Sequence, residues 1–406
     1  MAWELGGGLG HAGRLKPLAQ EALRRGHQVT LSLRDLTQTQ ALLSDLEAPL
    51  FQAPVWLHHV RGIPTPQISL AEILQGCGYL NANTLRGLFR GWHSLFQALQ
   101  PDFVLGDYAP TAMLAARALK IPNASTGVGF YLPPLNRPLP SLREWEAPQP
   151  VRLKTSEEQL LNACNAVLHE MGAQPLRMAC EVLHGGHTFL QAWPELDHYH
   201  REPDADSLRW WGPNISPDMG SAPEWPQGNG PEVFAYLNAN HPDDAQVLAA
   251  VARLGCRCVC YMPEVASGRL APVVSPQITY AKAPVNLGTT LNTCKLLICH
   301  AGASTLAQAL LAGVPVFMLP TQAEQLLMAR SVALAGCGIN SEDNTHPRNY
   351  EKLLGSMLGD SPYRQAARTF AAKYAGFSPA QQVVSLIDDI EKLAKQPSRQ
   401  APRANQ

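Results

Sequence analysis

The stretch Leu296-Leu297-Ile298-Cys299-His300-Ala301-Gly302-Ala303-Ser304-Thr305 is the part of the chain from which the fold is best predicted. Four apolar residues are followed by a histidine and a run of small residues, a pattern typical of a strand that enters a tight loop. A helix is expected to follow, from about Thr305 to Ala312. The start of a helix offers backbone N–H groups and about half a positive charge, which suits a diphosphate, and His300 adds a side-chain donor.

The sequence downstream makes this region specific. Gln308–Val316 reads Q-A-L-L-A-G-V-P-V, and Leu319–Gln325 then places an acid and an amide after the next strand. Together these runs resemble the donor-binding signature of UDP-sugar-dependent glycosyltransferases with the GT-B fold, of the macrolide, flavonoid and sterol type. The resemblance implies an α/β protein with two Rossmann-like domains, whose parallel sheets face each other across a cleft.

The N-terminal region begins with a glycine loop. Gly8-Leu9-Gly10-His11-Ala12-Gly13 follows a very short first strand and precedes a helix and the β run Val29–Leu33, which predicts a βαβ unit with parallel strands. The motif also matches G-x-G-x-x-G, with Asp35 at the distance of a ribose-binding acid, so an NAD-dependent oxidoreductase remains an alternative. His11 argues against it, because a bulky ring stands where a pyrophosphate needs close backbone approach.

The length of 406 residues favours two domains. Prolines and glycines gather between Trp210 and Gly230, as in an interdomain linker. We therefore expect an acceptor-binding domain over residues 1–210, a linker over 211–230, a donor-binding domain over 231–385 and a disordered tail over 396–406.

The resemblance also implies roles for individual residues. His11 would be the catalytic base and Asp107, at the end of a predicted strand, its orienting partner, with Gly8 and Gly10 forming the glycine loop. The residues implied in donor binding are His300, Gly302, Ser304, Thr305, Gln308, Glu324, Gln325, Val285 and Asn286. Gln308 stands where the family usually has a glutamate that holds the ribose, so the resemblance leaves a UDP-sugar and a dTDP-sugar open.

The implied reaction is inverting and independent of metal and cofactor. It moves a hexose from a nucleotide-diphosphate sugar to a hydroxyl group of a small or lipid-like acceptor. The loops Ala53–Asn83 and Ser125–Arg152 are rich in proline, leucine and aromatic residues, which favours an apolar acceptor. A nucleotide-sugar epimerase, an oxidoreductase and a non-catalytic GT-B auxiliary protein are the alternatives.

Composition excludes several other classes. Lysine and arginine number 32 against 33 aspartate and glutamate, so binding to nucleic acid through bulk positive charge is not expected. No signal-like segment or long apolar run occurs, which predicts a cytoplasmic protein with at most peripheral membrane contact. Cys256, Cys258 and Cys260 alternate as buried thiols on one face of a strand would.

Two histidine pairs have the spacing of metal ligands. They are His184 with His187 and His198 with His200. No cysteine or paired carboxylate accompanies them, so the sequence favours a protein without a metal site.

Overall fold

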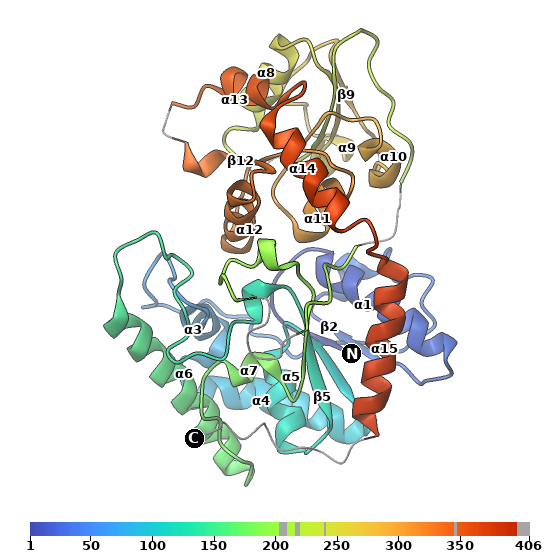
Figure 1. The fold of residues 1–406 in the computed structure, drawn as a ribbon. Coiled ribbons are helices and arrows are strands. Elements are labelled where there is room, and N and C mark those ends of the chain that lie inside the picture. The colour runs from blue at the N-terminus through green and yellow to red at the C-terminus, as the bar shows by residue number, and fades with distance from the viewer. Residues whose placement is uncertain (203–208, 216–219, 239–240, 345–346, 396–406) are drawn as a thin grey trace. The chain divides into compact units, whose positions relative to one another are not determined.

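The computed structural model describes residues 1–202, 209–215, 220–238, 241–344 and 347–395, and it divides into two compact units (Figure 1). Unit 1 comprises Met1–Pro194, Arg201–Gly212 and Ser378–Gln406, and unit 2 comprises Glu195–His200 and Pro213–Phe377. The tail predicted to be disordered, 396–406, lies outside the described residues.

Unit 1 contains a six-stranded sheet in which every neighbouring pair of strands is parallel, in the order β3-β2-β1-β4-β5-β6. The strands are β1 (Ala2–Trp3), β2 (Leu31–Leu33), β3 (Leu50–Gln52), β4 (Val104–Asp107), β5 (Asn123–Gly127) and β6 (Thr188–Leu190). The first strand is short, as the sequence predicted. The strand order reverses between β1 and β4, and such a switch point is where open α/β sheets bind ligands.

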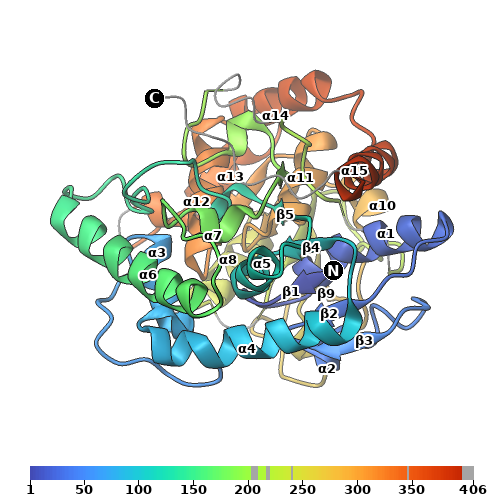
Figure 2. The same ribbon diagram turned by 90° about the horizontal axis from the view of Figure 1, so that it is seen from below.

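Helices surround this sheet, and the longest is α6. The helices of unit 1 are α1 (Gly10–Arg24), α2 (Leu36–Thr39), α3 (Leu70–Leu74), η1 (Gln75–Tyr79), α4 (Ala82–Leu99), α5 (Pro110–Ala118), η2 (Gly129–Tyr131), α6 (Pro150–Glu170), α7 (Glu181–His184) and α15 (Pro379–Ala394). Helix α4 packs against α5 and α6 (Figure 2). Its buried side chains are Leu85, Leu88, Phe89, Trp92 and Phe96, so the apolar face of this helix is turned to the core.

Unit 2 repeats the same topology. Its sheet has the order β12-β11-β10-β7-β8-β9, again parallel throughout, so the switch point lies between β7 and β10. The strands are β7 (Glu232–Tyr236), β8 (Arg257–Tyr261), β9 (Ile278–Tyr280), β10 (Leu296–Cys299), β11 (Val316–Met318) and β12 (Gly338–Asn340). Two Rossmann-like domains, the predicted fold class, are therefore present.

Eight helices belong to the described part of unit 2. They are α8 (Asp244–Arg253), α9 (Pro263–Ala266), α10 (Leu287–Leu291), α11 (Ala303–Leu311), α12 (Ala323–Leu334), η5 (Ser341–Asp343), α13 (Tyr350–Met357) and α14 (Pro362–Lys373); the short turn η3 (Pro194–Leu196) lies where the chain leaves unit 1. Cys256, Cys258 and Cys260 are buried in the core of this unit, as predicted, and all nine cysteines are unpaired.

The C-terminal boundary differs from the one read from the sequence. Helix α15 packs against α1, and its Leu386 and Ile387 join the hydrophobic core of unit 1 (Figure 1). Arg25 Nη1 donates to Asp388 Oδ1 at 2.7 Å, which pairs the same two helices. Residues 378–385 therefore belong to unit 1 and not to the donor domain, because the apolar face of α15 is buried on α1.

A second boundary also differs. Residues 195–200 were assigned to the N-terminal domain from sequence, but they belong to unit 2. The reason is a pair of contacts to the end of α14, where Glu195 accepts hydrogen bonds from Lys373 and from Tyr374 Oη. Within the residues described, no helix is long and apolar enough to span a bilayer.

Candidate functional site

The predicted catalytic pair meets at the switch point of unit 1. Helix α1 begins at Gly10, so His11 lies in its first turn, and Asp107 is the last residue of the neighbouring strand β4. Nδ1 of His11 lies 3.0 Å from Oδ1 of Asp107, and both side chains are buried. Because the carboxylate accepts the proton on Nδ1, it fixes the tautomer in which Nε2 carries the free lone pair.

The imidazole of His11 is held on its other faces by residues that the sequence analysis missed. Trp3 stacks on it with ring centroids 5.2 Å apart and planes at 16°. A Cβ on Gly6 would lie 2.4 Å from Nε2, and Gly6 adopts φ +80°, so only glycine fits there. The run Gly6-Gly7-Gly8 indicates a backbone without side chains before His11, but the G-x-G-x-x-G pattern includes only Gly8 and Gly10 of this loop and not Gly6.

Gly8 lies in the exposed loop that precedes α1, and Gly10 is the exposed first residue of that helix. Gly8 has φ +76°, a conformation that favours glycine, whereas the space around both residues is open. Their part in the site is therefore to shape the backbone that brings His11 to the strand ends.

Asp107 binds two further residues. Arg14 Nη1 donates to Asp107 Oδ2 at 2.6 Å, and the hydroxyl of Tyr131 donates to Oδ1 at 2.5 Å. Burial opposes ionisation of Asp107, but the charge of Arg14 and the hydrogen bonds from His11 and Tyr131 outweigh it, so the pKa of the carboxyl lies below its ordinary value. Asp107 is therefore an ionised acceptor and not a helix cap, since α5 is capped by Ala109.

A second buried carboxyl group lies at the end of β1. Glu4 accepts hydrogen bonds from the backbone N–H of Thr111 at 2.8 Å and from its hydroxyl at 2.5 Å, and Tyr79 Oη lies 2.6 Å from that hydroxyl. These hydrogen bonds lower the pKa of Glu4, but the effect of burial is larger and raises the pKa to about 7. This network ties α5 and η1 to the strand that carries Trp3 and the glycine loop.

In unit 2 the predicted diphosphate site lies at the start of α11. Gly302 is the N-cap of this helix, and Ser304 and Thr305 lie in its first turn, which presents backbone N–H groups and the positive end of the helix dipole. Ala301 adopts φ +62°, a left-handed conformation that favours glycine, so this turn is made by a residue with a side chain.

The side chain of His300 is arranged differently from the expectation. Its Nδ1 donates to the carbonyl of Leu319 at 2.6 Å, and its Nε2 accepts the backbone N–H of Asn238 at 2.9 Å. Burial lowers the pKa of His300, which makes the neutral form with the proton on Nδ1 the stable one. In this arrangement Nε2 is an acceptor, and it donates to a phosphate only after taking up a proton and leaving Asn238.

Three further residues predicted to bind the donor lie on α11 and α12, the helices that follow β10 and β11. Gln308 Nε2 lies 3.4 Å from the carbonyl of Ser304, and Gln325 Oε1 accepts the N–H and hydroxyl of Thr321 at 2.9 Å. Glu324 is half-buried in the first turn of α12.

Val285 and Asn286 were expected to meet the base of the nucleotide through their backbone. Val285 is buried, and the N–H of Asn286 donates to Ser221 O at 2.8 Å. The side chain of Asn286 caps α10 by accepting the N–H of Thr289. Since this N–H and this side chain are both used inside the protein, a base would have to contact other atoms of the segment.

Other motifs from the sequence have structural roles. Asp35 is the N-cap of α2, where its side chain accepts the N–H of Gln38 at 2.9 Å. This carboxylate therefore has a structural role, and the capping contact does not require a ribose. His184 is buried between Thr188 Oγ1 and the carbonyl of Pro133, and burial lowers its pKa to about 4. Across the described residues, no group of three histidine, cysteine or acidic side chains could hold a metal ion.

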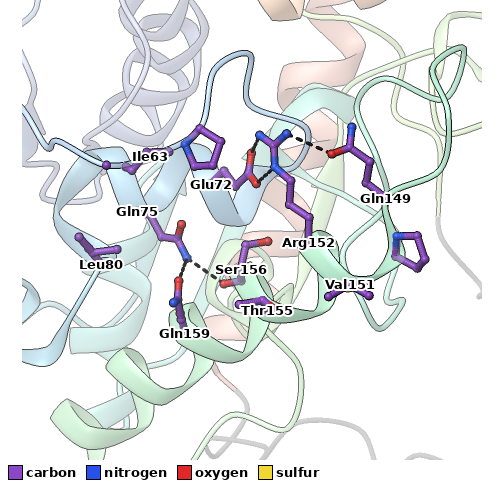
Figure 3. A pocket seen from close by; sticks show the side chains of 13 residues that line it. Ile63, Glu72, Gln75, Leu80, Gln149, Val151, Arg152, Thr155, Ser156 and Gln159 are labelled. Carbon is purple, nitrogen blue, oxygen red and sulfur yellow. Dashed lines mark hydrogen bonds and ion pairs between the residues drawn. The ribbon is translucent and has the colours of Figure 1, made fainter.

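A separate pocket of about 640 Å³ opens in unit 1 between the segment 62–80 and the start of α6 (Figure 3). One wall carries the ion pair of Arg152 with Glu72, at 2.6 Å and 2.8 Å, and the buried Gln75 bonds to Ser156 O and Gln159 Oε1. The apolar part of the lining comprises Ile63, Pro64, Leu80, Pro150 and Val151. Both loops predicted to surround an acceptor contribute to it.

Comparison with known proteins gives a family profile, sequence relatives and structural neighbours of this chain. The profile of the erythromycin biosynthesis protein CIII-like C-terminal domain matches residues 245–390. A PGL/p-HBAD biosynthesis glycosyltransferase of Mycobacterium tuberculosis (strain ATCC 25177 / H37Ra) is 25% identical over 353 residues, covering 79% of this chain and 78% of its own. A PGL/p-HBAD biosynthesis rhamnosyltransferase of Mycobacterium bovis (strain BCG / Pasteur 1173P2) is 26% identical over 335 residues, covering 77% and 72%.

Among solved structures, the spinosyn rhamnosyltransferase SpnG aligns over 96% of this chain and 99% of its own, with a TM-score of 0.66 and 17% identity. At that identity the likeness establishes the fold. Taken with the two Rossmann-like units, it shows the GT-B fold, and the sequence relatives indicate a glycosyltransferase; over residues 245–390 the chain is similar to the macrolide-type proteins.

Proposed function

We propose that the protein is an inverting glycosyltransferase that moves a hexose from a nucleotide-diphosphate sugar to a hydroxyl group of a small or lipid-like acceptor. The observation that carries the proposal is the buried hydrogen bond between His11 and Asp107 at the switch point of unit 1. An acceptor hydroxyl has too high a pKa to attack unaided, so a base must remove its proton in the transition state.

The proposed mechanism assigns one role to each member of the pair. Nε2 of His11 takes the proton of the acceptor hydroxyl while the oxygen attacks the anomeric carbon, and the bond to the diphosphate breaks on the opposite face. Asp107 holds Nδ1–H and stabilises the imidazolium that forms. A single displacement of this kind inverts the configuration at the anomeric carbon.

Stabilisation of the leaving diphosphate is assigned to unit 2. The N-terminus of α11 supplies backbone N–H groups and the positive end of its dipole, which is the reason to propose a reaction without a metal ion or cofactor. His300 joins this cradle as a charged donor once it is protonated, and Glu324 and Gln325 are proposed to bind hydroxyl groups of the sugar.

The nucleotide is proposed to be UDP or dTDP. Gln308 replaces the glutamate of the family signature, and an amide binds ribose hydroxyl groups without the strength of a charged acceptor. SpnG has been solved with thymidine diphosphate and with spinosyn aglycone, which supports a dTDP-sugar and a small-molecule acceptor. One sequence relative is named a rhamnosyltransferase, so a nucleotide-activated deoxyhexose is included among the candidate donors.

The pocket of unit 1 is proposed to receive the body of the acceptor. Its mixed lining suits a molecule with an apolar skeleton and a few polar groups. Leu80 in its wall follows Tyr79, whose hydroxyl bonds to Thr111, the residue that donates to Glu4 at the end of β1. Cytoplasmic location and at most peripheral contact with membranes stay predictions from the sequence.

The experiment is to incubate the purified protein with UDP-glucose, UDP-GlcNAc, dTDP-glucose and dTDP-rhamnose and a panel of hydroxylated acceptors, and to follow nucleotide release and product mass. We expect transfer with at least one pair, and a loss of about 10²–10⁴-fold in turnover for His11→Ala with nucleotide binding kept. Conversion of the donor without any acceptor would favour an epimerase. Thermal stabilisation by NAD alone would favour an oxidoreductase.

A further inference from the structure

Asp107 is bound on both carboxylate oxygens by groups other than the proposed base. Oδ2 accepts Arg14 Nη1 at 2.6 Å, and Oδ1 accepts the hydroxyl of Tyr131 at 2.5 Å in addition to His11. Arg14 Nη1 also lies 2.7 Å from the Tyr131 hydroxyl, so Arg14, Asp107 and Tyr131 form a closed ring of hydrogen bonds. The carboxylate is therefore oriented even without His11.

The positions of Arg14 and Tyr131 are themselves fixed by the fold. Arg14 lies three residues after His11 on α1, which puts both side chains on one face of the helix. The ring of Tyr131 stacks on Tyr108 at 4.4 Å and 6°, and a Cβ on Gly127, the last residue of β5, would lie 2.2 Å from it. Both groups are buried, so neither exchanges its contacts with Asp107 for water freely.

The charge balance gives this ring a consequence for catalysis. A buried carboxylate without a positive partner is costly, and without Arg14 the cheapest remedy is for the His11–Asp107 pair to hold one more proton. That proton leaves either an imidazolium beside a carboxylate or a carboxylic acid beside an imidazole whose proton is on Nε2. In both states Nε2 has no lone pair to offer, so the base is lost.

We propose that Arg14 is a positioning residue that keeps Nε2 of His11 unprotonated at neutral pH. Its guanidinium supplies the positive charge beside Asp107 that an additional proton on the His11–Asp107 pair would otherwise supply. The inference rests on the proposed role of His11 as the base. The titratable groups that contact Asp107 include His11 and Arg14 from α1 and Tyr131 from η2, and Tyr108 is stacked on Tyr131.

The test follows the titration of His11 by NMR in histidine-labelled protein, with its signal assigned by its absence in His11→Gln. In the wild type we expect a neutral ring with its proton on Nδ1 at pH 7.5. In Arg14→Met the titration midpoint of His11 should rise by about one pH unit or more, and in Arg14→Lys by clearly less. The acid limb of the kcat/KM profile should move up with it and activity should recover at high pH.

Arg25→Met is the matched control. Arg25 lies just beyond the end of α1 and pairs with Glu21, Asp388 and Glu391, so its loss removes an arginine with carboxylate partners away from the base. The His11 titration should not change in this variant. An equal midpoint in wild type and Arg14→Met, or an equal shift in Arg25→Met, overturns the proposal.

Two further readouts keep the outcomes distinct. If Arg14→Met does not fold, the wild-type spectrum still decides, because an imidazolium at pH 7.5 or a proton on Nε2 contradicts the proposal. The titration needs no substrate, whereas the proposed function fails separately if wild-type protein transfers no sugar from any donor tested.

Discussion

The backbone N–H of Asn238 donates to Nε2 of His300 across the switch point of unit 2, at 2.9 Å. Asn238 follows β7 and His300 follows β10, and these positions correspond to those of the residues that follow β1 and β4 in unit 1. The two switch points thus use histidine in opposite ways. His11 keeps Nε2 free for a proton, whereas His300 has both ring nitrogens bound by backbone groups.

This contact predicts that diphosphate binding is coupled to proton uptake. Nδ1 of His300 remains bound to Leu319 O, so Nε2 can donate to a phosphate only as part of an imidazolium, and burial lowers the pKa of that ring. A ligand that binds the protonated form must bind more tightly as the pH falls. Calorimetry with UDP or dTDP at pH 7–8, in buffers of different ionisation enthalpy, should give an uptake of up to about one proton.

His300→Ala is the control for that measurement. The variant should bind the nucleotide more weakly. It should also lose the proton uptake that comes from His300, so that only uptake by the phosphate groups of the nucleotide remains. Zero uptake in the wild type would mean that the helix N-terminus alone holds the diphosphate.

Much of this architecture was predictable because its signals are local. The strand and small-residue loop at 296–305 and the pairing of His11 with Asp107 follow from strand ends in parallel sheets, which lie at one edge. Arg14 and Tyr131 were not found, since nothing in a linear pattern reports that residues 14, 107 and 131 meet. The path of α15 onto unit 1 was missed for the same reason, because its amphipathic face fits either unit until the packing is known.

Gly6 gives a prediction about the space around the base. Alanine there would place Cβ 2.4 Å from Nε2 of His11 and would strain the backbone at φ +80°. The imidazole must move to admit it, and a displacement of about 1 Å from productive geometry costs about 100-fold in rate. We expect Gly6→Ala to lower kcat by at least about 100-fold, with nucleotide affinity unchanged.

Gly7→Ala is the neighbouring control for this measurement. No atom lies within 4 Å of a Cβ at Gly7, and its φ is not in the left-handed region. Steady-state kinetics of the two variants should therefore separate, and equal losses would show that the loop tolerates no side chain for reasons unrelated to His11.

Ala301 predicts an unusual response to glycine. Its φ of +62° costs a residue with a side chain about 1–2 kcal/mol. Replacement by glycine relieves that cost but loses a buried methyl group, worth about 0.8 kcal/mol, and about 0.4–1 kcal/mol of chain entropy. Ala301→Gly should therefore leave the free energy of unfolding of unit 2 nearly unchanged. Ala307→Gly, at an equally buried position within α11, should lower it by about 1–2 kcal/mol in urea denaturation.

Glu4 predicts a stability that falls as the pH rises. Its pKa is about 7 in the folded protein and 4.5 as the ordinary value, so between these limits the folded state holds a proton that the unfolded state has lost. Stability is then greatest below pH 4.5, declines up to about pH 7 and stays reduced above it, by about 3 kcal/mol for a shift of this size. Glu4→Gln should remove this decline, seen as a gain in unfolding free energy at pH 8 but not at pH 5.

Thr111 explains why glutamine is the suitable substitution. A glutamine carbonyl can accept the N–H of Thr111, and its amide can donate to the hydroxyl, so both contacts of Glu4 are kept. A gain of the same size at both pH values would indicate better packing and not the removal of a buried ionisable group.

The pocket in Figure 3 predicts how acceptor binding can be altered without touching the base. Thr155 is exposed on α6 and lines the pocket, so Thr155→Trp should fill part of its volume while the bond of Gln75 to Ser156 O is kept. We expect KM for a large acceptor to rise by about tenfold or more, with little change in kcat or in donor hydrolysis. Glu158→Trp adds the same side chain to an exposed position of α6 that is outside the pocket lining, and it should leave KM unchanged. If both variants raise KM equally, or neither does, the acceptor body binds elsewhere on the chain.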